Sequence, residues 1–168
     1  SLGILDGVPV AVKDELDMLP FPTMVGTKFY NTQPPVEDAT TVERLRSAGA
    51  LMVGKTNMHE IGLGVTGLNT HYGTTRNPHH LDHYPGGSSS GSAAAVAAGL
   101  CPIALGLDGG GSIRIPASLC GVVGLKTTWA RISSAGSAPL SWSLSTVGPI
   151  TSTVRDTALA YSFLAGPD

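Results

Sequence analysis

A strand that runs directly into a glycine loop is recognisable in the stretch Pro102-Ile-Ala-Leu-Gly-Leu-Asp108-Gly-Gly-Gly-Ser112-Ile-Arg114. Its first half is apolar and carries no charge before Asp108, which is typical of a buried strand over 102–107. Glycines tolerate backbone conformations that are closed to other residues, so successive amides in such a loop can turn toward one point. We therefore expect an α/β domain with an active site built on this loop, at Ser112.

Strands and helices alternate along the rest of the chain. Short apolar runs predict further strands at 8–12, 50–53 and 122–125. Helices are expected from Asp38 to Gly49, from Gly91 to Leu100 and from Thr153 onward, with Asp38 and Thr153 as N-caps. The buried stripe of the last helix is predicted to be Val154, Ala158, Tyr161 and Ala165. Residues 57–87 and 129–148 are expected to be mostly loop, and the alternation favours parallel strand pairing.

The composition limits the kinds of protein that the chain can be. Its 168 residues, 42% hydrophobic and 13% charged, suit part of one domain, so we treat 1–168 as a partial domain with no second domain. The formal net charge of -2 gives no electrostatic basis for binding nucleic acid. Cys101 and Cys120 lack metal-ligand spacing and are predicted to be buried thiols of a reducing compartment. No apolar run could span a membrane and Ser1 does not open a signal peptide, so we expect a segment of a cytoplasmic protein.

A nucleotide-binding pattern occurs in the middle of the chain but lacks its context. Gly49-Ala-Leu-Met-Val-Gly-Lys-Thr56 matches the P-loop pattern. A P-loop needs a strand before its first glycine and a flexible loop between its two glycines, whereas here a helix precedes Gly49 and the intervening residues are strand-like. We therefore predict a structural role for Lys55 and no nucleotide cofactor.

Three histidines form a second candidate site. His79, His80 and His83, with Asp82, include ligand types and a spacing that suit a metal. Prolines at 78 and 85 bracket them, which favours a solvated loop. No metal is expected.

A third pattern would make Ser89 the nucleophile. Gly87-Ser-Ser-Ser-Gly91 matches the G-x-S-x-G nucleophile elbow. An elbow needs a strand before it and a histidine and an acid after it, but residues 78–85 are polar and no histidine follows His83. The chain therefore does not support a Ser-His-Asp triad.

A lysine and two other serines suit hydrolysis better. Lys13 ends the apolar run Val8–Val12, where burial would favour the neutral amine that a general base needs. Ser88 lies in the Gly-Ser loop 85–92, and Ser112 follows the three glycines. The amides that can surround a developing oxyanion are those of Gly109, Gly110, Gly111 and Ser112. These residues predict a serine hydrolase that uses lysine as its base.

Several motifs resemble the amidase signature family. In chain order they are Gly7-Val-Pro-Val-Ala-Val-Lys-Asp14, Gly54-Lys-Thr-Asn57, Gly86-Gly-Ser-Ser-Ser-Gly-Ser-Ala-Ala-Ala95, Asp108-Gly-Gly-Gly-Ser-Ile-Arg-Ile-Pro-Ala117 and Cys120-Gly-Val-Val-Gly-Leu-Lys126. The resemblance covers essentially the whole chain, and the motifs are most similar to those of plant-type fatty acid amide hydrolases. It implies a mixed central sheet with helices on both faces, of which this chain is the core segment.

The resemblance also implies roles for single residues. Ser112 would be the nucleophile, Ser88 a bridging serine whose peptide bond is often cis, and Lys13 the base. Asp108 and Arg114 would hold the oxyanion loop. A small-molecule amide, such as a fatty acid amide, would be cleaved through an acyl-enzyme without a cofactor. A homodimer and peripheral contact with an intracellular membrane through other segments are compatible with the family.

Two other interpretations stay open. The chain could be a non-catalytic fragment or pseudoenzyme that retains the scaffold, or it could be the A subunit of a glutamyl-tRNA amidotransferase. Two departures from the family pattern, Ser145 in place of Asp and Trp129-Ala130 in place of an aromatic-glycine pair, predict different packing in the loop after the core.

Overall fold

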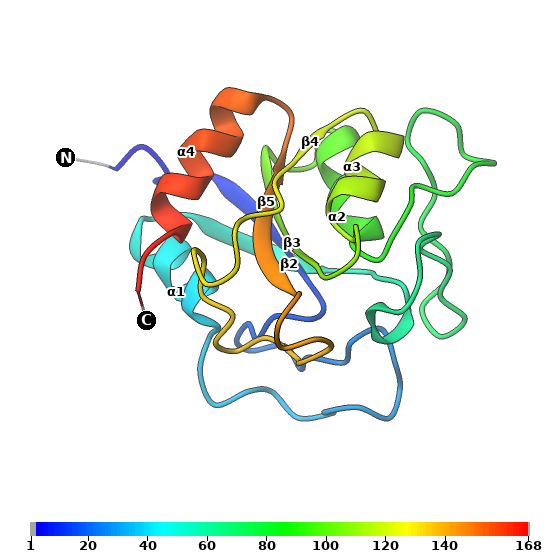
Figure 1. Ribbon diagram of the computed structural model, residues 1–168, viewed down its shortest axis with the longest axis horizontal. Helices are drawn as coiled ribbons and strands as arrows, with labels where there is room; N and C mark the ends of the chain where they lie inside the picture. Colours follow the sequence, from blue (N-terminus) through cyan, green and yellow to red (C-terminus); the bar gives the residue numbers. More distant parts are fainter. Residues whose placement is uncertain (1–2, 168) are drawn as a thin grey trace.

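The computed structural model describes residues 3–167, which build a five-stranded sheet flanked by helices (Figure 1). The strands are β1 (Pro9–Lys13), β2 (Leu51–Thr56), β3 (Ile103–Asp108), β4 (Val123–Gly124) and β5 (Thr146–Thr151). Across the sheet their order is β2-β1-β3-β5-β4. β1 pairs in parallel with β2 and β3, whereas β5 is antiparallel to β3 and β4. The sheet is therefore mixed, as the resemblance implied, and purely parallel pairing is wrong for β4 and β5.

Helices cover both faces of the sheet (Figure 1). They are α1 (Thr40–Ser47), the 3₁₀ turn η1 (Glu60–Gly62), α2 (Ser90–Ala97), α3 (Arg114–Leu119) and α4 (Val154–Leu164). Val10 and Val12 of β1 pack in the core under α1 and α4, whereas Ala11 packs in the core under α2. Because side chains alternate along a strand, Lys13 leaves β1 on the same face as Ala11, toward α2.

The start of α1 differs from the sequence prediction. Ala39 is the N-cap residue and provides no side-chain hydrogen bond. Asp38 instead accepts a hydrogen bond from the Leu19 amide at 2.7 Å and forms an ion pair of 2.7 Å with Arg46. The carboxylate therefore joins α1 to a distant loop, and this tertiary contact replaces the local cap.

The buried face of α4 also differs, although its cap is confirmed. The Thr153 side chain accepts a hydrogen bond from the Asp156 amide. Val154 and Ala158 are exposed, whereas Thr157, Ala160 and Leu164 are buried. Thr157 can face the sheet because its hydroxyl shares a hydrogen bond of 2.7 Å with the Thr151 hydroxyl.

β5 begins inside a segment that was expected to be loop. Its Gly148-Pro149 pair has the sequence of a turn. A Cβ at Gly148 would lie 2.1 Å from the Leu125 carbonyl oxygen, so glycine is needed there for close approach of two segments and not for a turn. The helix α3 was not predicted either, since it follows the glycine loop without an apolar pattern of its own.

The helices are short relative to a lipid bilayer. Within residues 3–167, no helix has the length and apolar character needed to cross a membrane.

The Thr153 cap gives a direct test of the fold. Thr153→Ala should lower the free energy of unfolding by about 1 kcal/mol, because an amide at the start of α4 loses its acceptor. Thr153→Ser keeps the oxygen and should lose less than half as much. Urea denaturation followed by circular dichroism measures both, and equal losses in the two variants would contradict the capping role.

Candidate active site

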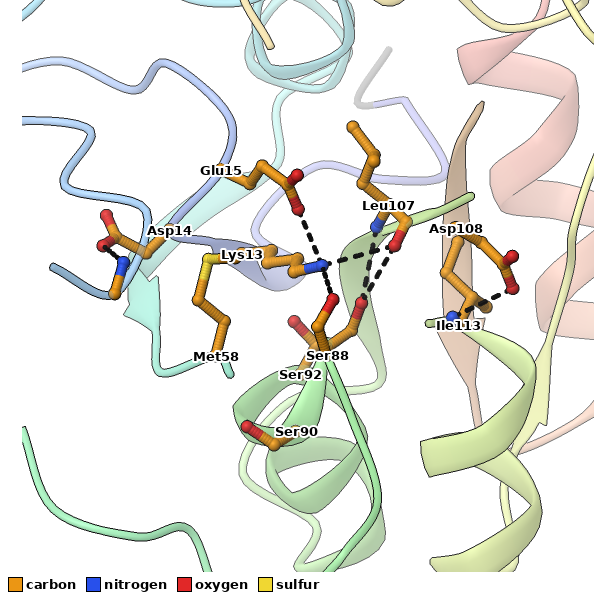
Figure 2. Close-up of polar contacts among 12 residues, drawn as sticks. Lys13, Asp14, Glu15, Met58, Ser88, Ser90, Ser92, Leu107, Asp108 and Ile113 are labelled. Atoms are coloured by element: carbon orange, nitrogen blue, oxygen red, sulfur yellow. Dashed lines mark hydrogen bonds and ion pairs between the residues drawn. The ribbon is translucent and has the colours of Figure 1, made fainter. Parts of the chain in front are cut away.

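The centre of the site is the buried amine of Lys13 at the end of β1. The side chain is 0% exposed, and its Nζ donates hydrogen bonds to Ser88 Oγ at 2.7 Å and to the Leu107 carbonyl oxygen at 3.3 Å. Leu107 lies on β3, the parallel neighbour of β1, and Ser88 lies in the loop that leads into α2. Figure 2 shows the amine between these partners and the Glu15 carboxylate. Two segments that are far apart in sequence therefore supply the lysine and its serine.

Residues outside the loop around Ser88 also fix its position. The Gly87–Ser88 peptide bond is cis, and the Ser88 carbonyl accepts a hydrogen bond from the His59 amide at 3.0 Å. The turn η1 closes over the pair, since a Cβ on Gly62 would lie 3.7 Å from Ser88 Oγ. The Ser88 hydroxyl thus occupies a narrow space between Lys13 and η1.

Ser112 lies in the glycine loop between β3 and α3. Asp108 is buried at the end of β3, and its carboxylate accepts hydrogen bonds from the amides of Gly111 at 2.7 Å, Ile113 at 3.0 Å and Arg114 at 3.2 Å. The Arg114 guanidinium binds both carboxylate oxygens, each at 3.0 Å. Asp108 and Arg114 therefore wrap the loop around one carboxylate and leave Ser112 partly exposed.

The carboxylate of Asp108 is held in its charged form. Burial by itself would raise the pKa of Asp108, but hydrogen bonds from the Arg114 side chain and from the amides of Ile113, Arg114 and Gly111 outweigh it and lower the pKa to about 2. The loop is therefore built on a carboxylate that stays ionised at every physiological pH.

The oxyanion amides differ in part from the sequence prediction. The Gly111 amide already donates to Asp108, so it is not free to bind a further acceptor. Within residues 3–167, the amides of Gly109, Gly110 and Ser112 donate no hydrogen bond to protein. The expected donor set is thus reduced from four amides to three.

The structure brings together two of the three predicted side chains directly. Lys13 and Ser88 are hydrogen bonded, but among the described residues no hydrogen bond joins Ser88 to the Ser112 hydroxyl. The two loops are in contact through the backbone, because the Ser89 amide donates to the Ser112 carbonyl at 3.1 Å. Catalytic hydrogen bonds are often long without substrate, so this arrangement is compatible with a relay from Ser112 to Lys13.

The competing motifs have structural roles in the fold. Lys55 lies on β2, where its amine binds the Leu16 carbonyl and the Thr23 hydroxyl and contacts Asp14 at 3.5 Å. Ser89 is 0% exposed, with its Oγ 3.4 Å from both the amide and the carbonyl of Leu107. Lys55 is thus structural, as predicted, and the Ser89 hydroxyl faces β3 where a substrate has no access.

The histidines are also engaged locally. His79 Nε2 lies 2.8 Å from the Cys120 carbonyl oxygen, and the rings of His80 and His83 contact each other edge to face. Over residues 3–167, no group of three or more His, Cys, Asp or Glu side chains is arranged to hold a metal.

Glu15 is a member of the site that the sequence pattern did not predict. Its Oε2 lies 2.7 Å from Lys13 Nζ, and the side chain is 1% exposed. Three carboxylates follow the lysine closely, Asp14, Glu15 and Asp17, and the sequence does not reveal which one points inward. A tight turn, in which the Leu16 amide donates to the Lys13 carbonyl at 3.1 Å, directs Glu15 back to the amine.

The fold described above matches that of known proteins. A comparison with models of protein families matches the Amidase family over residues 1–168. The chain therefore belongs to the amidase family.

The chain is similar to several known proteins. It is 52% identical over 166 residues to a fatty acid amide hydrolase of Arabidopsis thaliana, covering 98% of this chain and 27% of that protein. It is 49% identical to the A subunit of a glutamyl-tRNA(Gln) amidotransferase of Bacillus velezensis, covering 99% of this chain and 34% of that protein. The solved peptide amidase from Stenotrophomonas maltophilia superimposes with a TM-score of 0.95 at 43% identity, covering 99% of this chain and 35% of that one. The chain thus spans about a third or less of the length of these proteins.

The Asp108 network makes stability depend on pH in a defined direction. Because folding lowers the pKa of Asp108 to about 2, its contribution is complete above the unfolded value near 4 and is lost as the pH falls through 2. Asp108→Asn should therefore lower the free energy of unfolding by about 2 kcal/mol at pH 7, and the difference from wild type should shrink between about pH 4 and 2. Urea denaturation at a series of pH values measures this. Asp82→Asn, in an exposed loop, is the control, and a difference for Asp108→Asn that does not vary with pH would contradict the role.

Proposed function

We propose that this chain carries the catalytic core of an amidohydrolase, which cleaves the C–N bond of an amide through an acyl-enzyme on Ser112. The observation that carries the proposal is the buried hydrogen bond of 2.7 Å between Lys13 Nζ and Ser88 Oγ, next to the loop that presents Ser112. A buried amine is suited to act as a base when it is neutral. The family membership and the names of the relatives support the reaction type.

The proposed reaction proceeds in two stages. Ser112 Oγ attacks the amide carbonyl carbon while its proton passes to Ser88, and the Ser88 proton passes to the neutral Lys13 amine. The protonated lysine then returns a proton through Ser88 to the nitrogen of the leaving amine, and the C–N bond breaks. Water attacks the resulting ester of Ser112 by the same relay, which releases the acid and restores the serine.

The glycine loop has a distinct part in this proposal. Negative charge develops on the carbonyl oxygen during each attack, and amides that are fixed in advance stabilise it without reorganisation. Gly109, Gly110 and Ser112 supply such amides, while Asp108 and Arg114 fix their direction through the surrounding hydrogen bonds.

The substrate class that we propose is a small amide, with fatty acid amides as the first to test. Support comes from the fatty acid amide hydrolases of Arabidopsis thaliana and Medicago truncatula, which are 52% and 54% identical to the chain. We also propose that the protein acts in a reducing, cytoplasmic compartment and does not bind nucleic acid. The two free, buried cysteines and the net charge of -2 support that part.

Labelling of the nucleophile tests the function. A fluorophosphonate probe should add covalently to the wild-type chain, because an activated serine beside free amides attacks phosphorus. Ser112→Ala should abolish labelling, and Ser89→Ala should retain most of it because the Ser89 hydroxyl is buried. Intact mass and a peptide map give the readout. Label on Ser89 would overturn the assignment of Ser112 as the nucleophile. A folded wild-type chain that takes no label would leave only the scaffold interpretation.

The relay through Ser88 predicts a difference between substrates. Ser88→Ala should reduce kcat/KM for an amide by roughly 10²–10⁴-fold, since the amine needs a proton to leave. An ester with the same acyl group has a better leaving group and should lose much less. Matched amide and ester substrates measure this ratio, and an unchanged ratio would mean that Ser88 only shapes the loop.

A further inference from the structure

Glu15 is buried beside Lys13 but has no role in the proposed reaction. The side chain lies just beyond the end of β1 and is 1% exposed. Its Oε2 is 2.7 Å from Lys13 Nζ in an ion pair (Figure 2). No described residue donates a hydrogen bond of good geometry to either of its carboxylate oxygens. The lysine amine is therefore the only group in the described structure that compensates the buried carboxylate.

A buried ion pair is weak evidence for a role in stability. Removing a carboxylate from water costs several kcal/mol, and the attraction to one partner repays this only in part. Apolar residues of similar volume often replace buried pairs without loss of stability. A buried acid whose single partner is the candidate base therefore points to an effect on that base.

The other charged groups near β1 are paired elsewhere. On β2, Lys55 contacts Asp14 at 3.5 Å, and Asp14 also accepts hydrogen bonds from the amides of Met24 and Gly26. On the remaining elements around the lysine, the groups with partners of their own are Asp108 with Arg114, Lys126 with two backbone carbonyls, Glu60 with His71, and His59 with Thr66. The helix α2, which covers this face, carries no charged residue.

The turn η1 closes the space around the pair. A Cβ on Gly62 would lie 3.4 Å from Glu15 Oε1 and 3.7 Å from Ser88 Oγ. Gly62 is buried, so bulk solvent does not screen the carboxylate from that side. The charge of Glu15 consequently acts on the lysine at short range and in a site of low polarity.

We propose that Glu15 is a positioning residue for Lys13. Its carboxylate holds the amine against Ser88 and, by its charge, sets the pH range over which the amine loses its proton and becomes a base. This inference rests on the proposed function, in which Lys13 is that base.

The test follows the protonation of Lys13 directly, so it does not depend on catalytic turnover. The chain is labelled with ¹³C-lysine, the Lys13 Cε resonance is assigned by its loss in Lys13→Met, and its shift is followed against pH. In Glu15→Gln the midpoint should fall relative to wild type, because the negative charge beside the amine is removed. Glu15→Asp keeps the charge, so the midpoint should fall less in that variant. Glu43→Gln removes the same charge from the exposed side of α1 and should leave the midpoint in place.

A second measurement on the wild-type chain keeps the inference falsifiable if Glu15→Gln does not fold. With ¹³C-glutamate, the Glu15 Cδ resonance should move as Lys13 titrates, because closely paired groups titrate together. A stationary Glu15 resonance would overturn the proposal. So would a midpoint in Glu15→Gln equal to that of wild type, or equal shifts in the Gln and Asp variants.

Turnover separates this inference from the proposed function. If the chain hydrolyses an amide, the rising limb of kcat/KM against pH should move in Glu15→Gln by the same amount as the Lys13 midpoint. A midpoint that moves in a chain with no hydrolytic activity supports the role of Glu15 and contradicts the amidohydrolase. Hydrolysis with an unmoved midpoint supports the amidohydrolase and contradicts the role of Glu15.

Discussion

Burial of the Lys13 amine constrains most of the structure around it. A polar amine removed from bulk water must find its partners in the protein, and this one finds a serine hydroxyl, a backbone carbonyl and a carboxylate. These partners come from the loop before α2, from β3 and from the turn after β1. The parallel pairing of β1 with β3 brings Lys13 beside Leu107, and the Gly-Ser loop must then approach closely enough to reach the same amine. The sheet order and the path of that loop are thus tied to one side chain.

A buried carboxylate organises the second half of the site in a similar way. Asp108 ends β3 and collects the amides of the following loop, so that the loop reverses around it and starts α3. Gly111 must be glycine for this path, because its φ is +130° and a Cβ would lie 2.6 Å from Ile115 Cδ1. The lysine and the carboxylate lie at the ends of neighbouring strands, and the contact between the Ser89 amide and the Ser112 carbonyl joins their loops. Each half of the site is therefore built on a buried ionisable side chain whose partners the protein itself supplies.

The relatives help to separate what is common from what is particular. A TM-score of 0.95 with a solved peptide amidase at 43% identity means that the backbone of this part of the amidase fold is retained almost unchanged. The buried hydroxyl of Ser145, at a position where the resemblance to the family implies an acid, has no hydrogen-bond partner in the described residues and lies near Gly109. Ser145 thus lies at the edge of the glycine loop, whose path Asp108 determines.

Local sequence was enough for features that depend on local chemistry. The strand 102–107, the Thr153 cap and the structural role of Lys55 follow from apolar runs, capping chemistry and the order of elements. The sequence also singled out Lys13, Ser88 and Ser112, because their loops have specific compositions, and their catalytic roles stay a prediction. Tertiary structure alone decided three other features. One is the antiparallel β5 with its Gly148-Pro149 pair, and another is the inward direction of Glu15. The third is the choice of hydrogen-bond partner, since Asp38 binds the distant Leu19 amide and the Gly111 amide binds Asp108. The physical reason is that a carboxylate or an amide has several possible partners along the chain, and only the packed fold determines which one is close enough to bind.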